Sequence, residues 1–114
     1  MNRISTHVLD TARGKPAPAV KLRLEFREPN GAWRHLSSTQ TDAEGRCFQL
    51  LPEQEMVAEG FYRLTFDTAA YFGSQGISGL YPFVEITFHV RSGESHFHIP
   101  LLISPNGYTT YRGS

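Results

Sequence analysis

The sequence predicts an all-β fold, an eight-stranded antiparallel β-sandwich with one short helix. Several short runs alternate strictly between apolar and polar residues, as strands with one buried face do. Turn-forming sequences such as Asn30-Gly31 and Asp42-Ala-Glu-Gly45 separate these runs at the spacing expected of a sandwich. The pattern alone leaves the topology open, so the sandwich could be immunoglobulin-like or of another type.

Each expected element has its own signal. The clearest strand runs from Val20 to Arg27, where every second residue is apolar and the residues between them are charged. Asn30-Gly31 favours a hairpin to a partner strand from Trp33 to Ser38. The helical candidate is short, near Thr68 to Phe72, with Gly73 and Gly76 to end it. The remaining expected strands are Ile4 to Leu9, Arg46 to Leu51, Phe61 to Asp67, Val84 to Val90, His96 to Ile103 and Tyr108 to Ser114.

The length and the charge balance of the chain limit the kinds of site and partner that we expect. The chain of 114 residues is expected to be one domain, residues 1–114, with a modest core, so a site shared between subunits is expected. Its 11 basic residues equal its 11 acidic ones. This balance provides no long-range field for nucleic acid or an anionic membrane, and no apolar run approaches a membrane span. We therefore expect neither nucleic acid nor membrane as a partner.

The N-terminus and the cysteine content bear on location. Met1-Asn-Arg-Ile-Ser5 lacks the apolar region of a signal peptide, which predicts a cytoplasmic protein. A periplasmic or peroxisomal location would need a precursor segment absent from this sequence. Cys47 is the single cysteine, so no intrachain disulfide forms, and it is interpreted as a small apolar strand residue.

The segment from His96 to Ser114 holds most of the chemistry. His96 and His98 lie two apart on an expected strand and so project to the same face. Three interpretations are open for this pair: two histidines on a solvated face, two metal ligands with His7 as a third, or acid–base catalysis near neutral pH. Arg46, directly after a turn, is either a solvated residue or a planar donor for carbonyl and anionic ring atoms.

Three segments together resemble one family, the transthyretin-related 5-hydroxyisourate hydrolases. The first is the C-terminal Tyr111-Arg-Gly-Ser114, which matches the end of the family's chains. The second is Ser5-Thr-His-Val-Leu-Asp-Thr-Ala-Arg-Gly-Lys-Pro-Ala17, and the third is Thr41-Asp-Ala-Glu-Gly-Arg46. They stand at the family's spacing, and the resemblance extends over the whole chain.

The resemblance implies a transthyretin fold and a homotetramer. In that fold two four-stranded sheets pack together, edge strands pair between subunits, and two dimers enclose a central channel. The last two strands help to line the channel. His7 and His98 would face it, with His98 deeper than His96.

The resemblance also implies an activity, the hydrolytic ring opening of 5-hydroxyisourate to 2-oxo-4-hydroxy-4-carboxy-5-ureidoimidazoline in urate (purine) catabolism. It implies no cofactor and no metal. The expected catalytic residues are His7, His98, Arg46 and Ser114, and the expected substrate-binding residues are His7, Arg46 and Tyr111. Arg112 is either a further basic residue of the site or a structural partner for a carboxylate. The alternative function is a transthyretin-like carrier of small molecules without catalysis.

Overall fold

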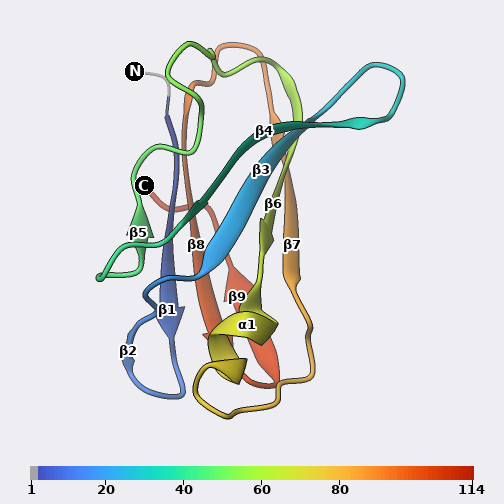
Figure 1. Cartoon of the computed structure of the whole chain (residues 1–114). Helices are drawn as coiled ribbons and strands as arrows, with labels where there is room; N and C mark the ends of the chain where they lie inside the picture. The colour runs from blue at the N-terminus through green and yellow to red at the C-terminus, as the bar shows by residue number, and fades with distance from the viewer. Residues whose placement is uncertain (1–2) are drawn as a thin grey trace.

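A computed structural model describes residues 3–114, which form nine strands and one helix (Figure 1). In chain order the elements are β1 (Arg3–Asp10), β2 (Lys15–Pro16), β3 (Lys21–Arg27), β4 (Trp33–Gln40), β5 (Arg46–Cys47), β6 (Gly60–Phe66), α1 (Thr68–Gly73), β7 (Val84–Val90), β8 (His96–Ser104) and β9 (Gly107–Thr110). The all-β class and the single short helix are confirmed. The helix begins at the Asp67 cap, whose side chain accepts a hydrogen bond from the Ala70 backbone N–H.

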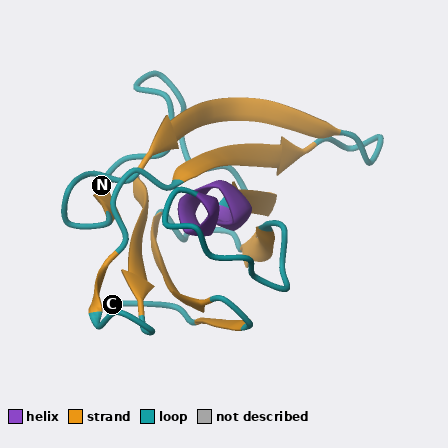
Figure 2. Cartoon of the chain, turned by 60° about the horizontal axis from the view of Figure 1, so that its bottom comes forward, coloured by secondary structure: helices purple, strands orange, loops and turns teal. Residues whose placement is uncertain are grey.

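The strands form two sheets. One sheet has the order β2-β1-β8-β9, with the two-residue β5 also pairing with β1, and the other has the order β4-β3-β6-β7. Figure 2 shows the two layers from one end of the molecule, with α1 in front. The expectation of a wholly antiparallel sandwich needs one correction, because β1 and β8 run parallel over eight register pairs. Strands that are far apart in the sequence can pair in either direction, so alternation within each strand does not predict this.

Two expected strands are shorter than predicted. The strand expected from Arg46 to Leu51 is reduced to β5, which ends at Cys47. The strand expected from Tyr108 to Ser114 ends at Thr110 and then makes one isolated bridge between Gly113 and His98. The bridge keeps the β8–β9 register. Pro100 accounts for the interruption, because it lies opposite the break and has no N–H to donate to the ladder.

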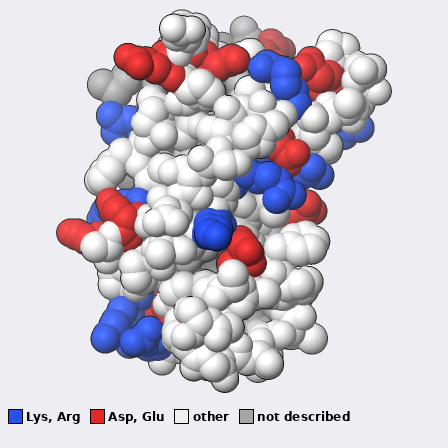
Figure 3. All heavy atoms as spheres, in the orientation of Figure 1, with Lys and Arg blue, Asp and Glu red and all other residues white. Residues whose placement is uncertain are grey.

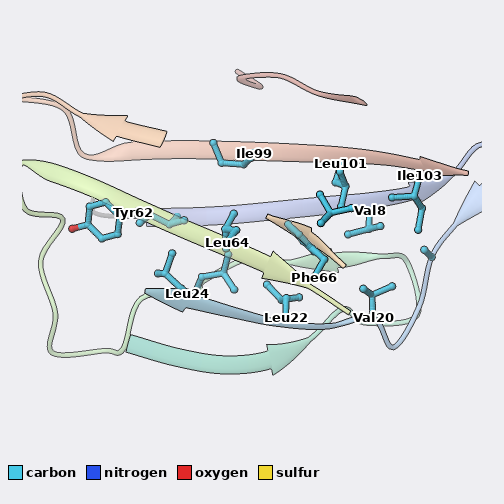
Figure 4. Close-up of a cluster of buried hydrophobic side chains, with 14 of the residues drawn as sticks. Val8, Val20, Leu22, Leu24, Tyr62, Leu64, Phe66, Ile99, Leu101 and Ile103 are labelled. Atoms are coloured by element: carbon cyan, nitrogen blue, oxygen red, sulfur yellow. The ribbon is translucent and has the colours of Figure 1, made fainter. Parts of the chain in front are cut away.

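The alternating apolar residues of both sheets meet in one hydrophobic core. Leu22, Leu24, Leu64 and Leu101 are at most 4% exposed. Figure 4 shows these side chains pointing from β3, β6 and β8 into the space between the two layers. Burying the apolar face of every strand fixes its orientation, so the intervening residues must point outward.

The same alternation determines which side chains lie on the outer face of the β1–β8 sheet. Along β1, Ile4 and Val8 enter the core, whereas Ser5 and His7 fall on the opposite face. The same rule on β8 puts Ile99 inside and His96, His98, Pro100 and Leu102 outside.

Charge is mixed on the surface that Figure 3 shows, where acidic and basic side chains lie next to one another in a few places on a mostly uncharged face. Among residues 3–114, no helix has the length and apolar character required to cross a membrane.

Candidate functional site

Strand register assembles the site on the outer face of the β1–β8 sheet. Ser5 on β1 is the parallel register partner of His98 on β8. His7, two residues further along β1, is the antiparallel partner of Arg46 on β5. Register partners project their side chains to the same face, so three of the predicted residues, His7, Arg46 and His98, share one surface.

A hollow of about 190 Å³ opens on this surface. It is lined by Arg3, Ser5, Thr6, Arg46, Phe48, His96, His98 and Ser114. A larger hollow, about 460 Å³, lies over β3 and β4, but its charged residues are Lys21, Arg23 and Asp67, and it has no imidazole. We assign the site to the smaller hollow because it combines imidazoles with an arginine.

His98 is half-buried and is held by Ser5, whose Oγ lies 2.9 Å from Nδ1 of the imidazole. Burial lowers the pKa of His98, and the positive charges of His7, Arg46 and His96 lower it further. His98 is therefore maintained as a neutral imidazole near neutral pH.

His7 is oriented by the loop before β5. Its Nε2 lies 3.0 Å from the carbonyl oxygen of Glu44. A carbonyl oxygen only accepts hydrogen bonds, so Nε2–H of His7 is the donor. In the neutral ring, Nδ1 is then the nitrogen that carries the lone pair.

Arg46 is positioned through its backbone. The carboxylate of Asp42 accepts hydrogen bonds from the N–H groups of Arg46 and Glu44, both at 2.9 Å, and these bonds lower the pKa of Asp42. Gly45 has φ of 77°, and a Cβ there would collide with the carbonyl oxygen of Val8. Within residues 3–114 no ion pair engages Arg46, so its guanidinium, 6.0 Å from the Phe48 ring centre, is available to a ligand.

The C-terminal tail closes the site against His98. The Gly113 N–H donates to the His98 carbonyl oxygen at 2.8 Å, which places Ser114 at the hollow. A Cβ on Gly113 would lie 2.5 Å from Cδ2 of the His98 ring. Only glycine leaves this edge of the imidazole undisturbed.

The structure does not bring Tyr111 to this hollow. Tyr111 is 58% exposed and lines a different hollow with Ile86, Phe88 and Arg112. For Arg112 the structural interpretation is supported, because its guanidinium donates to Glu94 at 3.1 Å and to the His96 carbonyl oxygen at 3.3 Å. His96 is exposed at the end of β8, as its place near the strand entrance predicts.

The sequence interpretation missed the residues that hold the site together. Ser5, Asp42, Phe48 and Gly113 were not singled out for the chemistry. Alternation could have found Ser5, because it falls on the same face as His7. Among the described residues 3–114, no three histidine, cysteine or acidic side chains are grouped closely enough to hold a metal ion.

The chain is similar to known proteins over nearly its whole length. The model of the HIUase/Transthyretin family matches residues 4–113. The chain is 45% identical to a 5-hydroxyisourate hydrolase of Mus musculus, over 97% of this chain and 94% of that one. It is 43% identical to a 5-hydroxyisourate hydrolase of Salmonella typhimurium, over 99% of this chain and 82% of that one.

Two solved structures share the fold over nearly their whole length. The 5-hydroxyisourate hydrolase of Klebsiella pneumoniae superposes with a TM-score of 0.86 at 36% identity and covers 100% of both chains. Sea bream transthyretin in complex with thyroxine superposes with a TM-score of 0.89 at 33% identity, over 96% of this chain and 93% of that one. The family match, the full-length relatives and the shared fold together show that this chain belongs to the HIUase/transthyretin family.

Proposed function

We propose that the chain is a 5-hydroxyisourate hydrolase, which opens the six-membered ring of its substrate at a cyclic amide bond. The observation that carries this proposal is that His98, Arg46 and Ser114 line one hollow, with His7 in register beside Arg46. Relatives 43% and 45% identical over nearly the full chain have the same name. The product is 2-oxo-4-hydroxy-4-carboxy-5-ureidoimidazoline, which places the reaction in urate catabolism.

The chemistry requires a base for water, a group that orients the substrate, and a donor for the developing oxyanion. His7 and His98 supply imidazoles that can exchange protons near neutral pH. Arg46 presents a planar set of donors to carbonyl oxygens and anionic nitrogens of the substrate ring. Ser114 adds a polar group from the tail. No cofactor is part of this proposal.

The second candidate is a carrier of small molecules, favoured by the close match in fold to sea bream transthyretin bound to thyroxine. The lining of the hollow argues against it. An apolar ligand requires a mainly apolar pocket, whereas this one has two arginines and two histidines. A carrier would bind without consuming its ligand, so the two functions separate in a turnover assay.

A homotetramer is part of the proposal. The site hollow is small, and the edge strands β7 and β9 flank an apolar hollow of about 370 Å³ lined in part by Ile86, Phe88 and Tyr111. Pairing these edges between copies would cover that apolar surface and protect the strand edges. Analytical ultracentrifugation tests this: a fully active monomer would contradict the shared-channel assembly.

The deciding experiment follows the ultraviolet absorbance of freshly generated 5-hydroxyisourate with and without purified protein. We expect the protein to accelerate the decay, with many substrate molecules consumed per protein molecule. A strong chelator should leave this rate unchanged. Stable binding without accelerated decay would favour the carrier, and loss of activity with the chelator would indicate a metal. The cytoplasmic location stays a prediction, to be checked by cell fractionation.

A further inference from the structure

The two histidines of the site have different hydrogen-bond partners. His7 donates from Nε2–H to the carbonyl oxygen of Glu44. His98 meets a hydroxyl, Ser5 Oγ, which is able either to donate or to accept. The burial of the Ser5 hydroxyl and its other available partners determine whether it donates to His98 or accepts from it.

Ser5 is 6% exposed, and in the described part of the chain its hydroxyl has one hydrogen-bond partner, Nδ1 of His98. A buried hydroxyl hydrogen without an acceptor is costly, so the Ser5 O–H donates to Nδ1. Neutral His98 then has its proton on Nε2. Because Nδ1 is occupied, this N–H is the group that the ring can offer to the hollow.

Two further features keep the His98 ring in this state. Gly113 packs against its Cδ2 edge, where any Cβ would lie 2.5 Å away, so the ring has little room to rotate from Ser5. The charged or titratable groups that lower the pKa of the ring are His7 on β1, Arg46 on β5 and His96 on β8, and Arg3 and Ser114 line the same hollow. When charged, His7, Arg46 and His96 are cationic, so they oppose a second proton on the ring.

We propose that Ser5 is a positioning residue that fixes His98 as the neutral tautomer protonated on Nε2. This rests on the proposed function and divides its roles between the histidines. His7 offers the lone pair of Nδ1 and takes a proton from the attacking water as the carbon–oxygen bond forms. His98 Nε2–H donates a hydrogen bond to the developing oxyanion. When the ring C–N bond breaks, the proton on His7 passes to the leaving nitrogen, and both imidazoles end unchanged.

The primary test is two-dimensional ¹H–¹⁵N NMR of histidine-labelled protein at a pH at which His98 is neutral, with its signals assigned from His98→Asn. We expect the chemical shifts of a protonated Nε2 and an unprotonated Nδ1. In Ser5→Asp an acceptor-only carboxylate should reverse this pattern and place the proton on Nδ1. A protonated Nδ1 in the unmodified protein would overturn the proposal. This readout needs no substrate, so it stands apart from the proposed activity.

The kinetic test compares Ser5→Ala with Ser5→Thr, which keeps the hydroxyl. We expect Ser5→Ala to lower kcat about tenfold with little change in KM, the scale of one hydrogen bond, and Ser5→Thr to retain most of the rate. Ser38→Ala is the matched control, because Ser38 Oγ lies 2.7 Å from Nε2 of His35 on an exposed strand far from the site. Equal losses in Ser5→Ala and Ser5→Thr, with both folded by circular dichroism, would contradict a role for the hydroxyl. Absence of turnover in the unmodified protein would refute the function while leaving the tautomer assignment to the NMR result.

Discussion

The outer faces of the two sheets differ in how their arginines are paired. On the β3–β6 face, Arg63 lies 2.8 Å from Glu25 and 3.7 Å from Glu85, and its guanidinium stacks over the Trp33 ring at 4.3 Å. On the β1–β8 face, by contrast, Arg46 has no ion-pair partner within the described residues 3–114. One arginine is engaged in holding strands together, and the other is left for a ligand.

The paired charges favour stability on the β3–β6 face, whereas the charges around His98 on the β1–β8 face do not. Compensated charges on a sheet surface reinforce strand pairing, whereas cations gathered around a half-buried imidazole repel one another. Such an arrangement is typical of a functional site, because it poises a titrating group at the expense of local stability. Substitutions on the two faces should therefore have different consequences.

The largest expected effect is the loss of an imidazole from the β1–β8 face. His98→Asn should lower the rate of 5-hydroxyisourate decay about a hundredfold or more, the usual scale for a lost oxyanion donor. The matched control is His35→Asn on the opposite sheet, where His35 is exposed and hydrogen-bonds to the Ser38 hydroxyl. Equal rates for the two variants would remove the distinction between the faces.

The next effect tests the packing of the tail on His98. Gly113→Ala introduces a Cβ 2.5 Å from the imidazole, so the ring or the tail must shift, and we expect at least a tenfold loss of activity in a folded protein. Gly107→Ala lies on the same hairpin, but its Cβ would meet only the Ser104 hydroxyl at 3.7 Å. It should retain nearly full activity. Comparable activity in both variants would show that the tail does not constrain His98.

The smallest effect concerns pH. The pKa of His98 is lowered by burial and by His7, Arg46 and His96, so an NMR titration should find His98 still mostly neutral at the ordinary histidine pKa of about 6.5. The same shift has a consequence for stability. Because the folded protein holds this proton less tightly than the unfolded chain, stability decreases as the pH falls below about 6.5.

His96→Asn sharpens this test by removing one cationic neighbour of His98. The NMR titration of His98 should move toward higher pH, and turnover at the optimum pH should change little. An unchanged titration would show that His96 does not act on His98, and a collapse of activity at all pH values would place His96 in the reaction itself.

Local alternation made much of this architecture predictable. The pattern of β3 correctly separated its buried leucines from its charged residues, and the spacing of His96 and His98 correctly put both on one face. The helix bounds were predicted almost to the residue because the glycines that follow are local signals, whereas the Asp67 cap was not predicted. The resemblance supplied the site residues that line the hollow.

The remainder depends on contacts between distant segments. Ser5 and His98 are 93 positions apart, and their hydrogen bond depends on a parallel pairing that neither strand reveals alone. The requirement for glycine at position 113 comes from the position of the His98 ring rather than from a local turn, because φ there is not in the left-handed region. The break in the last strand follows from Pro100, which acts on its neighbour across the sheet.

The measurement that tests the contrast between faces most directly compares Arg46→Ala with Arg63→Ala, scoring each for 5-hydroxyisourate turnover and for free energy of unfolding in urea. We predict that Arg46→Ala loses activity by about a hundredfold while its unfolding free energy changes little. Arg63→Ala should lose about 1.5 to 3 kcal/mol of stability, the range for hydrogen bonds to charged groups, and keep its activity. An Arg46→Ala protein with full turnover, or an Arg63→Ala protein that is stable but inactive, would contradict the division of work between the two faces.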